Sequence, residues 1–420
     1  MTDTQTKKFK PTESLSVVMH GKKVGELTWT RQGAYFTYIK EWLASGFNLS
    51  PLSMSFDEKP QLPSDSLFDG IHGPFADSLP DGWGLLLMDR FFERQFGAGV
   101  RLNLTQLDRL AYLGNRGMGA FEYYPMTEKI EREVVTLSEL YEASVQVQTG
   151  MTNEILDALR IAGGSPGGAR PKAAVALSTD LSYAISAYGG IPDGYAHWIV
   201  KFRSVNEPWS TGAIEYAYSL MAKSAGVDMA ESALLPVLSK EGGDERFFAT
   251  KRFDRNHEKK VHMMTAAGLI YANFRTPCLD YKALLRLTWR LTSNALEVEK
   301  MARLMIFNGL AHNYDDHAKN FSFLYDENQD EGQWRLAPAY DLTFSSGMGE
   351  HTTAFNGAGR PTRKDIKVLC SEYRFLKSDD YIDQTLAALA GRQSLFEALN
   401  IKISDGKEIF DALKDIQEQL

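Results

Sequence analysis

Five short apolar segments follow one another in about one fifth of this chain, with a single helical pattern among them. The helical pattern covers residues 214–225, and helical patterns dominate after residue 280. Alternating or short continuous apolar runs between turn residues are typical of strands. The strand-like segments are residues 173–177, 181–188, 197–202, 233–239 and 246–253. Strands followed by helices predict an α+β chain in which a small β-rich lobe precedes a larger helical lobe, with a cleft between them.

A separate pattern precedes these segments. Residues 14–43 alternate with a period of two residues around turns at Gly21–Lys23 and Gln32–Gly33, which predicts a hairpin or a small antiparallel sheet. Residues 50–82 are rich in Pro, Ser, Asp and Gly, so we expect a loop before a helix that begins near Trp83. We predict three domains, in the ranges 1–150, 151–255 and 256–420.

Charge and cysteine content restrict the partners and the compartment. The chain has 46 basic and 54 acidic residues and a net charge of −8, which disfavours autonomous binding to nucleic acid. Its two cysteines, Cys278 and Cys370, form no C-x-x-C pair, which excludes a disulfide scaffold and a four-cysteine zinc site. No apolar run approaches the roughly 18 residues of a membrane span, and the N-terminus has no signal-peptide pattern. We expect a cytoplasmic protein that binds no membrane.

The stretch of residues 312–320 carries the densest group of candidate catalytic side chains. Asp315 and Asn320 lie five residues apart between a predicted helix and a predicted strand, and Asp341 ends the next strand. Phosphoryl transfer in kinase-type folds uses this order: a carboxylate for the attacking hydroxyl, an amide ligand for Mg²⁺ and a second carboxylate ligand. The alternative for each motif taken alone is an ordinary polar loop. A zinc site is weaker, because His312 and His317 are five residues apart and not four.

Candidates for the rest of an ATP site lie upstream, in the order that a kinase requires. Residues 163–172 are rich in Gly and expose backbone N–H groups for phosphate, although they match neither common phosphate-loop pattern. Lys201 ends an apolar strand and requires a partner, for which Glu215 is the candidate. Lys251 and Phe253 fall where a hinge would contact adenine through the backbone. Taken singly, these features are also typical of a turn, a strand end and a helix first turn.

Several stretches together make the chain resemble the HipA family of serine/threonine kinases, the toxins of HipA/HipB toxin–antitoxin systems. The resemblance extends from about residue 14 to about residue 375. The stretches that carry it are residues 77–84 and 113–125 for the N-terminal domain, 165–172 for the phosphate loop, 251–255 for the hinge, 315–320 for the catalytic loop and 338–341 for the metal motif.

The resemblance implies a two-lobed fold like that of protein and lipid kinases, behind a packed N-terminal α+β domain, with ATP and Mg²⁺ as cofactors. It assigns catalytic roles to Asp315 and Lys201 and metal binding to Asn320 and Asp341, and Glu215 is the expected partner of the lysine. The expected ATP site contains Ser165, Gly167, Gly168, Ala169, Lys172, Lys201, Lys251, Phe253, His317 and Asn320.

The resemblance also implies regulation and partners. Autophosphorylation of Ser165 would inactivate the kinase, since a phosphate adds negative charge beside the ATP phosphates. The implied substrate is a translation-related protein such as an aminoacyl-tRNA synthetase, whose modification causes growth arrest and persistence. The implied partner is a small helix-turn-helix antitoxin like HipB, through which the chain would contact operator DNA only indirectly.

Two other functions use the same residues and stay open. One is phosphorylation of a small molecule, and the other is a kinase-fold scaffold that acts as a co-repressor of the antitoxin. Asp316 also leaves open which of two adjacent carboxylates contacts the hydroxyl. The five-residue step to Asn320 favours Asp315.

Overall fold

The structure is a computed structural model that describes residues 8–128, 136–150, 157–163, 167–188, 190–238, 244–257, 259–327 and 332–419. Ser165, the predicted autophosphorylation site, lies outside these residues. The chain forms two compact units. The first comprises Met1–Asn206, Asp254–Met264 and Gly268–Tyr271, and the second comprises Glu207–Phe253, Thr265–Ala267 and Ala272–Leu420. The three-domain division stays a prediction.

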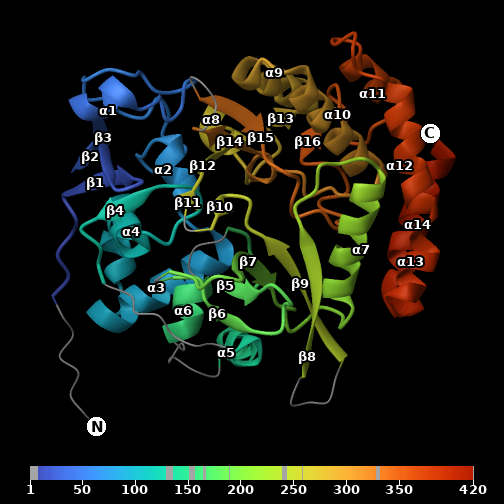
Figure 1. Ribbon diagram of the computed structural model, residues 1–420, viewed down its shortest axis with the longest axis horizontal. Helices are drawn as coiled ribbons and strands as arrows, with labels where there is room; N and C mark the ends of the chain where they lie inside the picture. The colour runs from blue at the N-terminus through green and yellow to red at the C-terminus, as the bar shows by residue number, and fades with distance from the viewer. Residues whose placement is uncertain are drawn as a thin grey trace. The chain divides into compact units, whose positions relative to one another are not determined.

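The first unit begins with a four-stranded antiparallel sheet, as the period-two pattern predicts (Figure 1). Its strands are β1 (Ser14–Met19), β2 (Lys22–Thr30), β3 (Gly33–Tyr38) and β4 (Glu122–Tyr124), in the order β3-β2-β1-β4. Gly21 adopts a positive φ of 72° in the tight turn between β1 and β2, a conformation that glycine reaches without steric cost. Alternate side chains such as Val17, Leu27 and Phe36 are fully buried.

Helices follow this sheet in the first unit. They are α1 (Lys40–Ser45), α2 (Gly73–Ser78), α3 (Gly82–Phe96), the 3-10 helix η1 (Val100–Asn103), α4 (Gln106–Leu113), α5 (Leu137–Thr149) and α6 (Asp157–Gly163). The helix predicted near Trp83 is therefore confirmed as α3. Its buried side chains Met88, Phe91 and Phe92 form a core cluster with Val100 and Tyr112, which fixes the orientation of α3 within the unit.

Three further strands complete the β structure that lies near the candidate phosphate loop. They are β5 (Lys172–Ser178), β6 (Ala184–Ser186) and β7 (Tyr195–Lys201), in the antiparallel order β6-β5-β7. Residues 172–177 are all buried, which explains the continuous apolar run of this segment. A short hairpin of β10 (Arg255–Asn256) and β11 (Lys259–Lys260) also belongs to the first unit. The chain then passes between the units through β12 (His262–Thr265) and α8 (Ala266–Ile270).

The second unit contains one helix over a strand pair and then a mainly helical region (Figure 1). Helix α7 (Thr211–Ser224) packs on the antiparallel strands β8 (Ser232–Leu238) and β9 (Asp244–Lys251). The helices that follow are α9 (Tyr281–Thr292), α10 (Ala295–Leu310), η2 (Ala318–Asn320), α11 (Arg363–Cys370), α12 (Ser378–Ala390), α13 (Arg392–Ala398) and α14 (Ile403–Gln419). The short strands among them are the antiparallel pair β14 (Ser322–Asp326) and β15 (Gln333–Leu336) and the parallel pair β13 (Leu279–Asp280) and β16 (Thr353–Ala354).

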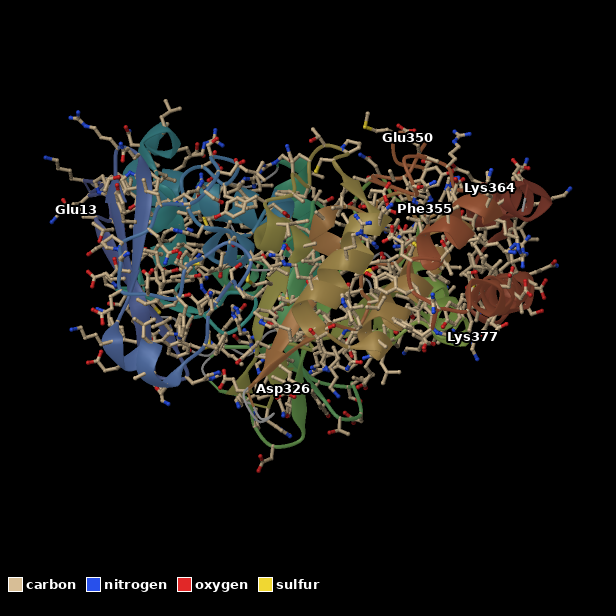
Figure 2. The ribbon with its side chains drawn as sticks, turned by 90° about the horizontal axis from the view of Figure 1, so that it is seen from above. Glu13, Asp326, Glu350, Phe355, Lys364 and Lys377 are labelled. Atoms are coloured by element: carbon tan, nitrogen blue, oxygen red, sulfur yellow. The ribbon has the colours of Figure 1, made fainter. Side chains whose placement is uncertain are left out.

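The surface and core of the second unit separate by residue type. Phe355 is fully buried, whereas Lys364 on α11 and Lys377 before α12 are exposed (Figure 2). In the part of the chain that the structure describes, no helix has both the length and the hydrophobicity that crossing a bilayer requires.

Candidate active site

The predicted catalytic loop lies between the end of α10 and the start of β14 in the second unit. The side-chain Nδ2 of Asn320 donates to the backbone oxygen of Asp315 at 2.7 Å, and the Asn320 backbone N–H donates to the oxygen of His317 at 2.9 Å. His317 precedes η2, and its Nδ1 accepts from the N–H of Lys319 at 3.3 Å. These hydrogen bonds link the two ends of the segment 315–320, so Asp315 and Asn320 are held at a fixed separation.

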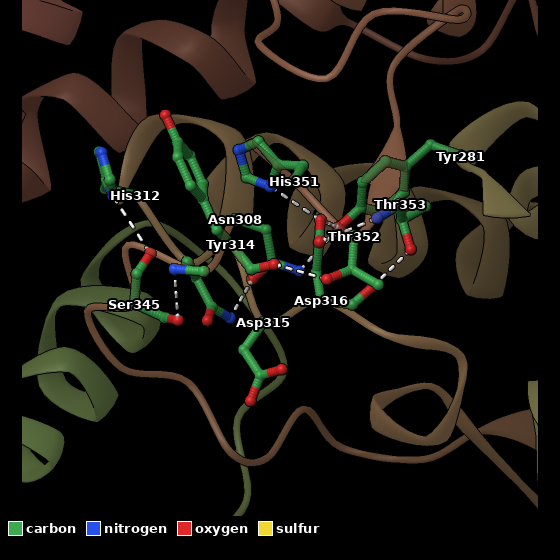
Figure 3. Close-up of polar contacts among 12 residues, drawn as sticks. Tyr281, Asn308, His312, Tyr314, Asp315, Asp316, Ser345, His351, Thr352 and Thr353 are labelled. Carbon is green, nitrogen blue, oxygen red and sulfur yellow. Dashed lines mark hydrogen bonds and ion pairs between the residues drawn. The ribbon is translucent and has the colours of Figure 1, made fainter. Parts of the chain in front are cut away.

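The two adjacent aspartates of this loop have opposite environments (Figure 3). The Asp316 carboxylate is fully buried and accepts from the Tyr281 hydroxyl at 2.8 Å, from His351 Nδ1 at 2.9 Å and from the Thr353 N–H at 3.0 Å. The Asp315 side chain is 61% exposed, with one carboxylate oxygen 3.9 Å from His317 Nε2. Asp316 therefore fixes the loop, and Asp315 is the one of the two carboxylates that is exposed to solvent.

A buried polar chain extends from Asp316 into the helices below it. Asn308 donates through Nδ2 to the Tyr281 hydroxyl at 2.9 Å, and Asn313 donates through Nδ2 to Asn308 Oδ1 at 3.0 Å. Burial and the neighbouring Asp316 carboxylate raise the pKa of Tyr281 well above its usual value, so its hydroxyl stays protonated and donates. Sequence reasoning missed this chain because its members are distributed over α9, α10 and the segment between α10 and η2, and no spacing links them.

The segment that ends in Asp341 is tied to the same loop. The Tyr340 hydroxyl donates to the backbone oxygen of Lys319 at 2.5 Å and lies 2.6 Å from the Ser322 hydroxyl. Asp341 itself adopts a positive φ of 57°, an uncommon conformation for a residue other than glycine that is frequent at functional sites. The catalytic and metal motifs are thus joined through Tyr340.

The donor set of these motifs suits Mg²⁺. Within the described ranges, no group of three or more His, Cys, Asp and Glu side chains is placed to hold a metal by itself. Mg²⁺ commonly binds one or two protein ligands together with nucleotide phosphates. Asn320 uses its amide nitrogen on Asp315, so its Oδ1 is the predicted ligand atom, and a second ligand from the Asp341 carboxylate stays a prediction.

The predicted hinge residues lie at the end of β9 and directly after it, in the second unit. The Lys251 N–H donates to the backbone oxygen of Glu231 at 2.8 Å, and Lys251 Nζ pairs with the Glu231 carboxylate at 2.8 Å. The Lys251 N–H is therefore already used within the protein, and a backbone contact of this segment to adenine stays a prediction. Phe253 packs against Tyr340 with ring centroids 5.5 Å apart.

The phosphate-binding candidates belong to the first unit. Lys172 and Lys201 are directly paired positions of β5 and β7, so both side chains leave the same face of the sheet. Their exposed fractions are 4% and 6%. Two cationic side chains are therefore buried on one face of this sheet, and their binding to phosphate stays a prediction. Glu215 is fully buried on α7 of the second unit, and its pairing with Lys201 stays a prediction.

The described part of the phosphate loop, residues 167–170, is called the glycine loop below. Its Gly167 carbonyl accepts a hydrogen bond from Lys172 Nζ. Gly168 has a positive φ of 95°, a backbone conformation that favours glycine at this position. The sequence left open a phosphate loop and an ordinary glycine-rich turn for these residues, and the role in phosphate binding stays a prediction.

Comparisons with known proteins agree with this architecture. Residues 15–124 match the HipA N-terminal domain, and residues 164–399 match the HipA-like C-terminal domain. A chain of the solved Shewanella oneidensis MR-1 toxin–antitoxin complex of HipA, HipB and operator DNA shares the fold, with a TM-score of 0.67, 17% identity and 96% of each chain covered. The fold is therefore the α+β fold of the HipA class, as predicted. The chain belongs to the HipA family.

Two curated relatives match parts of the chain. "Putative kinase Y4dM" from Sinorhizobium fredii is 30% identical over 170 residues, which cover 38% of this chain and 40% of that protein. "Putative kinase" from Haemophilus influenzae is 28% identical over 139 residues, which cover 30% of this chain and 39% of that protein. The chain thus spans about two fifths of the length of each relative in these matches.

Proposed function

We propose that this chain is an ATP-dependent protein serine/threonine kinase that acts as the toxin of a HipA/HipB-type toxin–antitoxin pair. The observation that carries the proposal is the catalytic loop, in which Asn320 braces an exposed Asp315 while Asp316 is consumed by buried hydrogen bonds. The kinase names of both relatives and the family membership support the same activity.

The proposed chemistry assigns each group one task. Asp315 orients the acceptor hydroxyl and takes its proton as the hydroxyl oxygen bonds to the γ-phosphorus of ATP and ADP leaves. Lys172 and Lys201, buried on one sheet face, bind the phosphates. Asn320 and Asp341 would hold Mg²⁺, and the bound ion would supply neutralisation of the phosphate charge.

Autophosphorylation of Ser165 is the proposed regulatory step. A phosphate on this residue, three positions before Gly168, would place nearly two negative charges in the segment that precedes the buried Lys172. Those charges would compete with the ATP phosphates for the same cations, so the product of the reaction would inhibit the enzyme.

The proposed partners follow from the family and from the charge of the chain. A small helix-turn-helix antitoxin is the proposed partner because the related solved complex contains HipA together with HipB and operator DNA. A net charge of −8 is consistent with operator DNA being contacted chiefly through the antitoxin. The proposed substrate is a translation-related protein such as an aminoacyl-tRNA synthetase.

Intact-mass spectrometry of phosphatase-treated protein incubated with Mg-ATP tests the kinase activity. We expect the wild type to gain one phosphate and the Ser165→Ala and Asp315→Asn variants to gain none, with Asp326→Asn as a matched control at a surface position of the same unit. Phosphate gain at the wild-type rate by Asp315→Asn would refute the assigned role. Transfer to small hydroxyl compounds in place of proteins in a lysate would identify a small-molecule phosphotransferase. ATP binding without any transfer, together with tighter operator binding by the antitoxin, would identify a scaffold.

A further inference from the structure

The start of helix α3 contacts the glycine loop through two hydrogen bonds to one residue. The Gly168 N–H donates to the Asp81 carboxylate, and the Trp83 N–H donates to the Gly168 carbonyl at 3.0 Å. Both backbone polar groups of Gly168 are therefore bound by residues of the N-terminal segment 77–84, which the kinase chemistry proposed above does not use.

Asp81 makes this contact and does not cap its own helix. It is the N-cap residue of α3, a position where aspartate normally accepts a hydrogen bond from its own helix. Its side chain makes no such cap bond here and accepts from Gly168 instead. The Asp81 carboxylate thus binds a loop more than eighty residues away in sequence and not its own helix terminus. This choice of partner is evidence that the contact serves the loop.

A close backbone approach between the start of α3 and the glycine loop accompanies these hydrogen bonds. Gly82 has a positive φ of 44°, and a Cβ atom there would lie 2.6 Å from the Cα of Ala169 and 2.6 Å from the Gly168 carbonyl oxygen. Both of these contacts are to backbone, which cannot turn aside as a flexible side chain can. The chain therefore needs glycine at position 82 to let α3 approach the loop this closely.

Lys172 also contacts the loop. Its Nζ donates to the Gly167 carbonyl, and a Cβ atom on Gly168 would lie 2.4 Å from this ammonium. The glycine loop is thus bound by the carboxylate of Asp81 and by the ammonium of Lys172. If the Asp81 carboxylate only competed with phosphate for the Gly168 N–H, the second hydrogen bond would be unexplained. In that bond the Trp83 N–H donates to the Gly168 carbonyl, and a phosphate cannot take the place of this carbonyl.

We infer that Asp81 is a positioning residue that holds the glycine loop and Lys172 in the arrangement that accepts nucleotide phosphates. It acts through Gly168 and touches no reacting atom. The inference rests on the proposed kinase function, and it makes the start of α3 a part of the nucleotide site that a kinase-domain motif search would not include.

Calorimetric titration of ATP-Mg into the full-length chain tests this inference, in an Asp315→Asn background that prevents turnover. We expect Asp81→Ala to weaken ATP binding about tenfold or more, because a hydrogen bond to a charged group is lost. Asp81→Asn retains an oxygen acceptor and should restore most of the affinity. Asp89→Asn is the matched control, because Asp89 lies on the same helix and pairs with Arg109 without contacting the loop.

Hydrogen exchange without nucleotide provides a readout that does not depend on ATP. Faster exchange of peptides covering residues 167–172 in Asp81→Ala, with unchanged exchange of β1 to β3, is the expected result, and general unfolding would instead speed both. If the Asp315→Asn protein with no further substitution bound no ATP, the proposed function itself would be refuted. ATP binding that Asp81→Ala leaves unchanged or strengthens would refute only the positioning role, and strengthening would identify Asp81 as a competitor of phosphate.

Discussion

The Asp315 and Asp316 side chains are neighbours in the chain, yet the first is 61% exposed and the second is fully buried. The burial of Asp316 is matched by three hydrogen-bond donors from Tyr281, His351 and Thr353. Asp316 therefore supports the fold, whereas Asp315 is exposed and has the catalytic role only in the proposed function. Variants at the two positions should separate stability from activity.

We predict that Asp316→Ala lowers the free energy of unfolding by about 3 kcal/mol, because it leaves buried donors without an acceptor. Urea denaturation followed by circular dichroism measures the change. Asp315→Asn is the matched substitution on the neighbouring residue, and it should change the free energy of unfolding by about 0.5 kcal/mol or less. Equal losses at the two positions would contradict the division of roles.

Lys172→Met should weaken ATP binding by about tenfold or more, because it removes an ammonium from the sheet face that also carries Lys201. Titration with ATP-Mg measures the affinity. Lys364→Met removes the same charge at an exposed position of α11 and should leave the affinity unchanged. A similar loss in both variants would mean that net charge, and not the buried lysine pair, controls binding.

Two glycines of positive φ should respond differently to alanine. Gly99 has a φ of 87°, and a Cβ atom added there would meet no other atom within 4 Å, whereas a Cβ atom on Gly82 would lie 2.6 Å from two backbone atoms. We expect Gly99→Ala to cost about 1 kcal/mol of unfolding free energy from the backbone conformation alone. Gly82→Ala should cost more, by about 1 to 3 kcal/mol, and thermal or urea unfolding would measure both. Equal costs would show that α3 and the glycine loop separate easily.

The stability of the first unit should depend on pH through His72. This side chain is fully buried beside Phe36 and Phe75, and burial lowers its pKa to about 4. Between pH 6.5 and 4 the unfolded chain binds a proton that the folded chain does not bind, so stability falls as the pH falls. The full loss is about 3 kcal/mol.

Unfolding free energies measured from pH 7 to pH 4 for the wild type and for His72→Leu check this dependence. The variant has no titrating group at this position, so its stability should fall less over the same interval. Parallel curves for the two proteins would mean that other groups cause the acid sensitivity.

Local patterns were sufficient for much of the fold. The period-two segments of residues 14–43 predict β1, β2 and β3, and the apolar runs from residue 173 predict β5, β7, β8 and β9. Strand and helix periods follow from backbone geometry, so each element can be recognised from its own residues. The family was also recognisable, because its motifs are contiguous stretches of sequence.

Contacts between distant residues were not predictable in this way. The sequence places Asp315 and Asp316 in identical local surroundings, and only the five-residue step favoured the first. The donors that bury the second come from α9 and from the segment around β16, and no spacing rule connects residues so far apart.

The sequence by itself determined the element types, the family and the order of the catalytic motifs, because these depend on neighbouring residues. Only the tertiary structure decided that Asp316 is structural, that Lys172 and Lys201 share one sheet face and that Asp81 binds Gly168 rather than its own helix. Each of these outcomes depends on which buried groups find hydrogen-bond partners when the chain packs. These partners come from other segments of the chain, so the local sequence does not reveal them.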